Sequence, residues 1–352
     1  MTTLPNGETK VAARSRSTMR DVAALAGVSI KTVSRVINQE PGVSGRLSFK
    51  VFDAVDRLDY RHDFAASALR RTDRRSSTIG LVLKNVANPF SSSLHRAIEE
   101  QARDRNVLVL AGSSDEDPDR ERSLIGNFAG RRVDGLIIVP TGPDQSYLMT
   151  ERRAGTGIVF VDRTPTFFDA DCVLTDNEQG TRQGVRHLIE NGHTKIAYLG
   201  DLQTIVTAQL RLQGFRQEML AAGIRVNDQY VKLNLGDEEI ARATMLDMFS
   251  NDDPPTAVFA SQNLLTIGAV RALRSLQLHD RVALVGFDDI LMADLLQPAL
   301  TVVAQDPVVI GRTSADLLFR RLDGDTAPTQ HLVIASQLIV RGSGEIRPEG
   351  SR

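Results

Sequence analysis

The run MRDVAALAGVSIKTVSRVIN, residues 19–38, decides how the N-terminal part of this 352-residue chain folds. Thr18 stands directly before the run and Asp21 follows three residues later, which is the pattern of a helix-capping box. Gly27 ends this first short helix, because glycine readily adopts the left-handed backbone that follows a helix end. Ser29 is placed to cap a second helix in the rest of the run. Two short helices joined by a glycine turn predict a helix-turn-helix.

Apolar residues recur in this region with helical spacing and predict a small three-helix core. The third helix is expected to follow Ser44 and to close the core under the second helix. The side chains expected to face inward are Val22, Leu25 and Ala26 in the first helix, Val33, Val36 and Ile37 in the second, and Leu47, Val51, Phe52, Val55 and Leu58 in the third.

The second helix, Ile30 to about Asn38, turns a polar face outward. Its hydroxyl, amide and cationic groups are able to reach base edges and phosphate oxygens in a DNA groove. The residues on this face are Lys31, Thr32, Ser34, Arg35 and Asn38. A generic helical hairpin has the same spacing, so a merely solvated helix face remains an alternative.

The distribution of charge separates the two ends of the chain. Residues 1–76 hold 14 Lys and Arg against 8 Asp and Glu, a net charge of +6, whereas the remaining residues hold 28 against 36, a net charge of −8. A basic head on an acidic body is expected when one end of a protein meets phosphate. The single cysteine, Cys172, excludes a disulfide framework and is interpreted as a small apolar residue. The sequence contains no uninterrupted apolar run long enough to span a membrane.

The pattern DVA-x-x-AGVS-x-x-TVSRV-x-N resembles the DNA-binding head of the LacI/GalR family of bacterial regulators. The resemblance implies that Ile30, Lys31 and Arg35 read bases in the major groove. It implies phosphate contacts or helix caps for Thr18, Ser29, Thr32, Ser34, Asn38 and Ser44.

In this family the segment after the third helix is a hinge that inserts a leucine into the DNA minor groove. The matching segment here is 63–69, within a hinge expected at 63–76, and Leu69 holds the wedge position. The chain departs from the usual family pattern at His62, Asp63 and Ser67. Ordinary packing of Leu69 within a linker helix is the alternative reading.

Short, continuously apolar runs alternate with helical stretches in the rest of the chain, which predicts parallel sheets covered by helices on both faces. The runs are residues 79–83, 107–112, 133–140, 157–162, 195–200, 257–261 and 282–289. Their number suggests two doubly wound lobes. The sequence lacks the glycine-rich fingerprints of dinucleotide and P-loop nucleotide sites. The predicted fold is an all-α helix-turn-helix head followed by an α/β body of two doubly wound parallel-sheet lobes.

Residues 77–343 again resemble the LacI/GalR family, whose regulatory domain is similar to periplasmic sugar-binding proteins. The matching segments include NPF at 88–90, RRVDGLIIVP, VFVDR, TDN-x-x-G, RLQGF and VGFDD. The resemblance implies effector contacts from Phe90, Ser91, Arg163, Arg211, Gln262, Asn263 and Asp288. Arginine, carboxylate and aromatic groups suit the hydroxyls and C–H faces of a sugar, so a sugar or sugar derivative is the expected effector.

The expected organisation is a disordered tail at 1–17, a DNA-binding domain at 18–62, a hinge at 63–76, an effector-binding and dimerisation domain at 77–345 and a tail at 346–352. Lobe one is expected at 77–175 plus 306–335, and lobe two at 176–305 plus 336–345. The C-terminus lacks a leucine-heptad helix, so we expect a homodimer that meets a pseudo-palindromic operator. No export signal, cofactor, metal site or catalytic constellation is expected, and the resulting hypothesis is a cytoplasmic, nucleoid-associated repressor. A solute-binding protein and an enzyme on the same fold class are the rival hypotheses.

Overall fold

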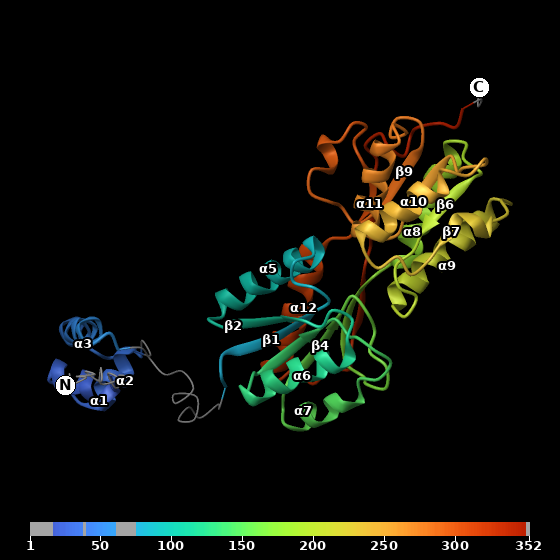
Figure 1. Cartoon of the computed structure of the whole chain (residues 1–352). Helices are drawn as coiled ribbons and strands as arrows, with labels where there is room; N and C mark the ends of the chain where they lie inside the picture. Colours follow the sequence, from blue (N-terminus) through green and yellow to red (C-terminus); the bar gives the residue numbers. More distant parts are fainter. Residues whose placement is uncertain (1–16, 38–39, 61–74, 350–352) are drawn as a thin grey trace, which may run out of the picture. The chain divides into compact units, whose positions relative to one another are not determined.

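A computed structural model describes residues 17–37, 40–60 and 75–349 (Figure 1). Its contacts divide the chain into two compact units, residues 1–76 and 77–352. We call the first unit the head and the second the body. No helix in the described residues is long and apolar enough to cross a membrane.

The described residues of the head form the helices α1 (Met19–Ala26), α2 (Ile30–Ile37) and α3 (Gly45–Arg57). Thr18 and Asp21 form the predicted capping box, in which the Thr18 side chain accepts from the Asp21 amide and the Asp21 carboxylate accepts from the Thr18 amide. Gly27 ends α1 in the left-handed conformation, with φ of 65°. The helix-turn-helix and its caps are therefore confirmed.

The core of the head is narrower than the sequence predicts. Val22, Val33 and Val51 are fully buried at its centre. Helical spacing predicts that Leu25, Leu47 and Phe52 face inward, but they are 42%, 37% and 48% exposed. The prediction is wrong for these three, because three short helices bury only the narrow stripe on which they meet and leave the edges of each apolar face in solvent.

The body contains two six-stranded sheets, each with helices on both faces (Figure 1). The first sheet has the order β11-β5-β4-β3-β1-β2 and is parallel throughout. We call this sheet and the helices packed on it lobe one. Its elements are β1 (Thr78–Leu83), α5 (Pro89–Asp104), β2 (Leu108–Ser113), α6 (Pro118–Gly130), β3 (Gly135–Ile138), η1 (Ser146–Leu148), α7 (Met149–Arg153), β4 (Gly157–Val161), β5 (Asp171–Thr175), α12 (Pro307–Leu322) and β11 (His331–Ile334).

The second sheet has the order β12-β10-β9-β8-β6-β7, and in it only β12 runs antiparallel to its neighbour. We call this sheet and its helices lobe two. Its elements are α8 (Asn177–Glu190), β6 (Ile196–Leu199), α9 (Val206–Ala221), η2 (Asp228–Tyr230), β7 (Val231–Lys232), α10 (Glu238–Met248), β8 (Ala257–Ala260), α11 (Asn263–Ser275), β9 (Ala283–Phe287), η3 (Ala293–Leu295), β10 (Thr301–Ala304) and β12 (Gln337–Ile339).

Each lobe has an apolar core on both faces of its sheet. In lobe one, α5 and α12 cover one face and α6 covers the other. In lobe two, α8 and α9 cover one face while α10 and α11 cover the other. All seven apolar runs contain strands of these sheets, so the predicted doubly wound body is confirmed. The chain passes between the lobes after β5, after β10 and after β11.

The C-terminal segment differs from its expected form as a tail. The carbonyl oxygen of Ile346 accepts a hydrogen bond from His193, and the Ile346 side chain packs on the lobe-two core. Glu349 accepts a hydrogen bond from Arg281 at 3.0 Å. Residues 346–349 are thus part of the folded body, because an apolar side chain and a paired carboxylate hold them to it.

Candidate nucleic-acid interface and ligand pocket

The second helix of the head presents the side chains that the sequence assigns to DNA. Ile30 is 41% exposed, Lys31 is exposed, and Thr32, Ser34 and Arg35 are half-buried. The Arg35 guanidinium donates to the Pro41 carbonyl oxygen at 2.5 Å and lies 3.4 Å from the Glu40 carboxylate. Two of its nitrogens, Nη2 and Nε, therefore face partners within the head.

The hydroxyl residues of the head divide into those that cap helices and those that do not. Thr18 caps α1, and Ser29 caps α2 by accepting from the Thr32 amide at 3.1 Å. Ser44 precedes α3, but its side chain makes no capping hydrogen bond. Asn38 and Leu69 lie outside the described residues, as do His62, Asp63 and Ser67.

The candidate pocket of the body lies where the strands of both sheets end. It encloses about 480 Å³, including the space at its open mouth. The loops that follow parallel strands meet at this edge of a sheet, which is where open α/β proteins bind ligands. Its lining residues are Lys84, Asn88, Phe90, Ser91, Val139, Asp162, Arg163, Asp201, Thr207, Arg211, Gln262, Asn263, Asp288 and Gln305. The structure thus brings all seven predicted effector residues together.

Half of the pocket lining was not among the predicted contacts. Lys84 and Asp201 each follow an apolar strand, and this is the same signal that points to Arg163 and Asp288. Asn88 holds the N-cap of α5, where its side chain accepts from the Phe90 amide. Gln305 donates to the Asp288 carboxylate at 2.6 Å. The position of Lys84 and Asp201 at the ends of apolar strands is the sequence signal that marks them as pocket residues.

Arg163 is held firmly within lobe one. It is 7% exposed, and its terminal nitrogens donate to the Glu116 carboxylate at 2.8 and 2.7 Å. A third hydrogen bond, at 3.3 Å, reaches the Pro140 carbonyl oxygen. Burial tends to raise the pKa of Glu116, but the hydrogen bonds and charges of Arg163 and Lys84 outweigh it and lower that pKa below its usual value. Glu116 is therefore an ionised carboxylate at neutral pH.

Arg211 is the corresponding cation of lobe two. Its guanidinium donates to Asn177 Oδ1 and to the Ser261 carbonyl oxygen, each at 2.7 Å. It also lies over the Phe287 ring, 3.8 Å from the ring centroid. These contacts fix the plane of the guanidinium at the pocket wall. A fixed cation of this kind can donate to ligand oxygens without losing side-chain entropy on binding.

Asp162 and Asp288 hold equivalent places in the two lobes. Each follows a central strand, each has φ of 71°, and their amides donate to Val173 and Val303 of the neighbouring strands. Left-handed backbone at a residue with a side chain is uncommon and is concentrated at functional sites. Burial raises the pKa of Asp288, and Arg211 and Gln305 only partly counter this.

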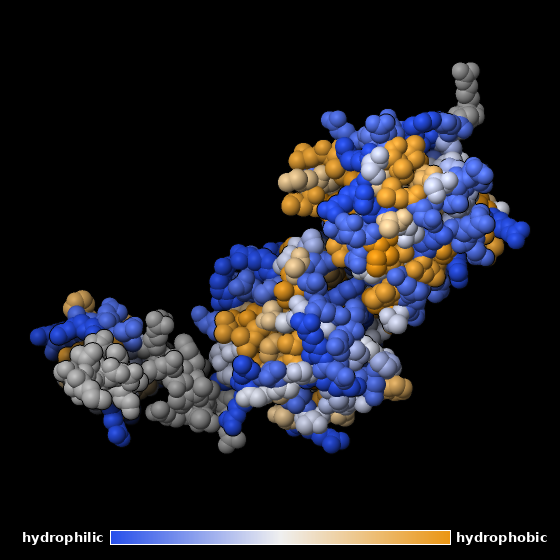
Figure 2. Space-filling view, in the orientation of Figure 1, coloured by the Kyte–Doolittle hydropathy of each residue, from blue (hydrophilic) through white to orange (hydrophobic). Residues whose placement is uncertain are grey.

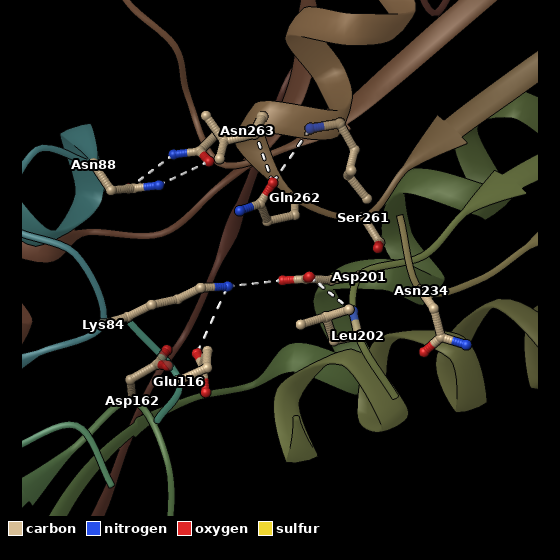
Figure 3. Close-up of polar contacts among 12 residues, drawn as sticks. Lys84, Asn88, Glu116, Asp162, Asp201, Leu202, Asn234, Ser261, Gln262 and Asn263 are labelled. Carbon is tan, nitrogen blue, oxygen red and sulfur yellow. Dashed lines mark hydrogen bonds and ion pairs between the residues drawn. The ribbon is translucent and has the colours of Figure 1, made fainter. Parts of the chain in front are cut away.

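The side chains of Gln262 and Asn263 have structural partners of their own. Gln262 Oε1 caps α11 by accepting from the Leu264 and Leu265 amides at 2.8 and 3.2 Å. Asn263 and Asn88 exchange amide hydrogen bonds at 3.1 and 3.0 Å (Figure 3). Only the amide nitrogen of Gln262 is left to face the pocket, so its ligand contact would be that of a donor.

Comparison with known proteins matches both parts of this architecture. Residues 18–63 match the family described as bacterial regulatory proteins, lacI family, and residues 185–344 match the periplasmic binding protein-like domain. The chain is 33% identical over 334 residues to the ribose operon repressor of Escherichia coli (strain K12), covering 93% of this chain and 99% of the relative. It is 31% identical over 339 residues to the HTH-type transcriptional regulator DegA of Bacillus subtilis (strain 168), covering 93% and 98%.

Solved structures agree over nearly the full chain. The Lac repressor dimer bound to operator and the anti-inducer ONPF is 27% identical, with a TM-score of 0.82 over 94% of this chain and 99% of that one. The complex of the transcriptional regulator CelR with cellobiose is 31% identical, with a TM-score of 0.69 over 93% and 100%.

A DNA-binding head joined to a binding-protein-like body is the architecture of the DNA-binding transcription regulators. The matched relatives are regulators of this class and are not enzymes. Within that class the chain belongs to the lacI family of bacterial regulatory proteins.

Proposed function

We propose that this regulator is a homodimeric repressor of carbohydrate-metabolism genes, controlled by a small sugar-like effector bound in the pocket between its lobes. The observation that carries the proposal is the convergence of the seven predicted effector residues on one pocket in a chain whose head belongs to a DNA-binding family. Relatives named for the ribose operon and for a cellobiose complex support a carbohydrate effector. Its place of action would be the cytoplasm, at the nucleoid.

The chemistry of the pocket suits a polyhydroxylated ligand. It presents fixed carboxylates, an oriented guanidinium and side-chain amides, which together offer both donors and acceptors to vicinal hydroxyls. Phe90 is half-buried at the pocket wall and can supply apolar contact.

An apolar surface on lobe two supports dimerisation. Leu291, Met292 and Leu295, in the loop after β9, are 82%, 60% and 71% exposed, and Figure 2 shows the apolar patch that this loop forms. Large exposed apolar side chains that cluster on a surface mark protein–protein contacts. A second copy of the chain is the occupant we propose, in keeping with the relative solved as a dimer on its operator. Two heads related by a twofold axis would then meet a pseudo-palindromic operator.

The first experiment tests DNA recognition. Purified protein is incubated with sheared genomic DNA of the organism that encodes it, at fixed physiological salt, and the retained fragments are sequenced. We expect a short pseudo-palindrome close to genes of sugar uptake or breakdown. Enrichment of no sequence, both alone and in the presence of a panel of sugars, would contradict the proposal.

The second experiment tests the pocket. Operator binding is titrated with a panel of pentoses, hexoses and cellobiose, and one sugar is expected to shift the operator Kd by about tenfold or more, the usual range of allosteric coupling. Arg211→Ala removes the fixed guanidinium and should abolish this shift while operator binding remains. Arg271→Ala is the matched control, because Arg271 is a half-exposed arginine of the same lobe that pairs with Glu238 and Glu239 and does not line the pocket. A normal response in the Arg211 variant would show that the pocket is wrongly assigned.

A further inference from the structure

One loop of lobe one reaches across the pocket to lobe two at both of its ends. The loop runs from Lys84 to Asn88, between β1 and α5. The Lys84 ammonium lies 3.2 Å from the Asp201 carboxylate of lobe two. At the other end of the loop, Asn88 exchanges its pair of amide hydrogen bonds with Asn263 of lobe two (Figure 3).

Lys84 lies between carboxylates of both lobes. Besides Asp201, it is 3.6 Å from the Glu116 carboxylate of lobe one. Glu116 also receives both terminal nitrogens of Arg163, so its position does not depend on Lys84. Asp201 is fixed as well, because its other oxygen accepts from the Leu202 amide at 2.7 Å. The lysine is thus the movable member of a bridge between two anchored carboxylates.

The burial of these groups makes the bridge stronger than a surface ion pair. The side chains of Lys84, Glu116 and Asp201 are 27%, 15% and 9% exposed. Partly buried charges are screened little by salt, whereas fully exposed pairs contribute almost nothing. The Lys195–Asp253 pair, at the opposite end of β6, shows the contrast, with side chains 48% and 67% exposed.

The formal charges at the pocket wall explain why Lys84 extends toward lobe two. In lobe one, Lys84 and Arg163 are balanced by Asp162 of the pocket lining and by Glu116, which is not part of the lining but pairs with both cations. Lobe two contributes one cation, Arg211, against Asp201 and Asp288. The excess carboxylate of lobe two therefore attracts the one pocket cation of lobe one that has a flexible stem.

We propose that Lys84 is an inter-lobe latch, whose ammonium bridges Glu116 and Asp201 and sets the separation of the two lobes and, through it, the operator-binding state. The link to operator binding rests on the proposed function. Lys84 directly follows β1, and β1 begins at Thr78, immediately after the residues that connect to the head. Along the chain, strand β1 alone separates Lys84 from the residues that connect to the head.

The separation of the lobes is measured by pulsed electron–electron resonance on the full chain. Spin labels are placed at Asp119→Cys on α6 and Leu220→Cys on α9, which are exposed positions in lobe one and lobe two. Cys172 is fully buried and stays unlabelled, which labelling of the parent chain verifies. Labelled protein is diluted with unlabelled protein, so that only distances within one chain are recorded.

The decisive variant is Lys84→Met, which keeps the length of the side chain and removes its charge. We expect a broader distance distribution that extends to longer distances, because Asp201 and Glu116 then have no shared cation. Lys195→Met removes an exposed lysine of lobe two and should leave the distribution as in the parent chain. An unchanged distribution in the Lys84 variant would overturn the latch.

A charge exchange distinguishes a latch from ordinary packing. Lys84→Glu should widen the distribution further, and adding Asp201→Lys should restore it, because Lys at 201 would lie between Glu at 84 and Glu116. Thermal unfolding of each variant confirms that it folds. A double variant that folds but stays as broad as the single variant would show that Lys84 acts through packing, and the latch would be wrong.

The coupling to the head is tested on the operator recovered by the genomic experiment. Lys84→Met should change the operator Kd by about tenfold with no sugar added, the usual size of an allosteric coupling, while Lys195→Met should not. An altered distance distribution with unaltered operator affinity would overturn the coupling and leave the latch. Because the distance measurement uses neither sugar nor DNA, failure of the repressor hypothesis and failure of the latch can be told apart.

Discussion

Lobe one and lobe two are built on the same strand plan, with β1, β3, β4 and β5 of the first sheet matched in order by β6, β8, β9 and β10 of the second. The correspondence extends to the pocket. Asp162 follows β4 and Asp288 follows β9, with the same left-handed backbone and the same hydrogen bond to the next strand. The backbone therefore supplies two equivalent platforms. What distinguishes them is the side chains that the two platforms carry.

Those side chains give the two walls opposite electrostatic character. In lobe one the carboxylate of Glu116 is paired with Arg163 and Lys84, and its pKa is lowered although burial opposes this. In lobe two the carboxyl of Asp288 is buried, and burial raises its pKa because Arg211 and Gln305 only partly compensate. One fold thus places a stabilised charge in lobe one and a disfavoured charge in lobe two.

The packing of helices provides the first test of how equivalent the lobes are. Gly268 of α11 crosses α10 in lobe two, and a Cβ there would lie 2.4 Å from the Glu238 carbonyl oxygen. Gly311 of α12 crosses α5 in lobe one, and its Cβ would lie 2.8 Å from the Leu94 carbonyl oxygen. Backbone atoms cannot move aside as a flexible side chain can. We expect Gly268→Ala to lower the free energy of unfolding by about 3 kcal/mol, the upper end for overpacking, and Gly311→Ala by less.

Urea unfolding followed by circular dichroism measures both losses. Gly126→Ala is the control, since Gly126 lies within α6 and a Cβ there has nothing within 4 Å. This exposed helical substitution should raise stability by about 0.5–1 kcal/mol. If both variants lose the same free energy of unfolding, the two helix crossings are packed equally tightly, and the lobes match in helix packing as they do in strand order.

The second test uses the opposite pKa shifts of the two walls. Because the folded pKa of Asp288 is raised above its ordinary value of 3.8, its contribution to stability is present below that pH and is lost as pH rises through the folded pKa. Asp288→Asn should therefore raise the free energy of unfolding at pH 7 by about 1 kcal/mol, since an unfavourable buried charge is removed. At pH 4 the variant should gain little.

Glu116→Gln is the matched variant in lobe one and should behave in the opposite way. The lowered pKa of Glu116 stabilises the fold above its ordinary value of 4.5, and this contribution is lost as pH falls through the folded pKa. The variant should be destabilised at pH 7, where Arg163 loses its charged partner. Thermal melts at a series of pH values check both signs, and two variants with the same sign would contradict the electrostatic contrast between the walls.

The sequence predicts those features that depend on neighbouring residues. The capping box of Thr18 and Asp21 is visible because both partners lie within one turn. The central strands are visible because both faces are buried, which makes them continuously apolar. Strand β5, with the sequence DCVLT, is not visible in this way. Its buried Asp171 is paired with Arg321, which is 150 residues further along the chain, and no local pattern contains that partner.

The same limit applies to the pocket. The family resemblance identifies Arg211 and Asp288 as effector contacts position by position. It does not identify the residues of the other lobe that lie across the pocket from them. The bridge from Lys84 to Asp201 joins residues 117 apart and exists only once both sheets are folded and facing each other. In the head, helical periodicity places Leu25 and Phe52 on the apolar face of their helices. It does not show whether another helix covers that part of the face. Their exposure follows from how α1, α2 and α3 pack against one another, which no single helix reveals.

The third test concerns the C-terminal segment, whose described residues 346–349 pack on lobe two. The ring of His193 is hydrogen-bonded at one nitrogen to the Ile346 carbonyl oxygen, at 2.7 Å, and at the other to the Thr256 hydroxyl, at 2.9 Å. Burial lowers the pKa of His193, and the hydrogen bond to Ile346 only partly opposes this. The folded state therefore disfavours the charged ring.

A lowered histidine pKa gives stability that is present above the ordinary value of 6.5 and is lost as pH falls through the folded pKa. Between pH 7.5 and 5.5 we expect the melting temperature of the body to fall by about 2 °C through this residue, since about 1 kcal/mol moves the midpoint of a domain of this size by a few degrees. In the His193→Gln variant, the part of the decrease in melting temperature that comes from this residue should disappear. His331→Gln, at an exposed position on the edge strand β11 of lobe one, should leave it in place. If the His193 variant keeps the full decrease, the acid sensitivity of the body arises outside the C-terminal segment, and the asymmetry between the lobes is confined to the pocket walls.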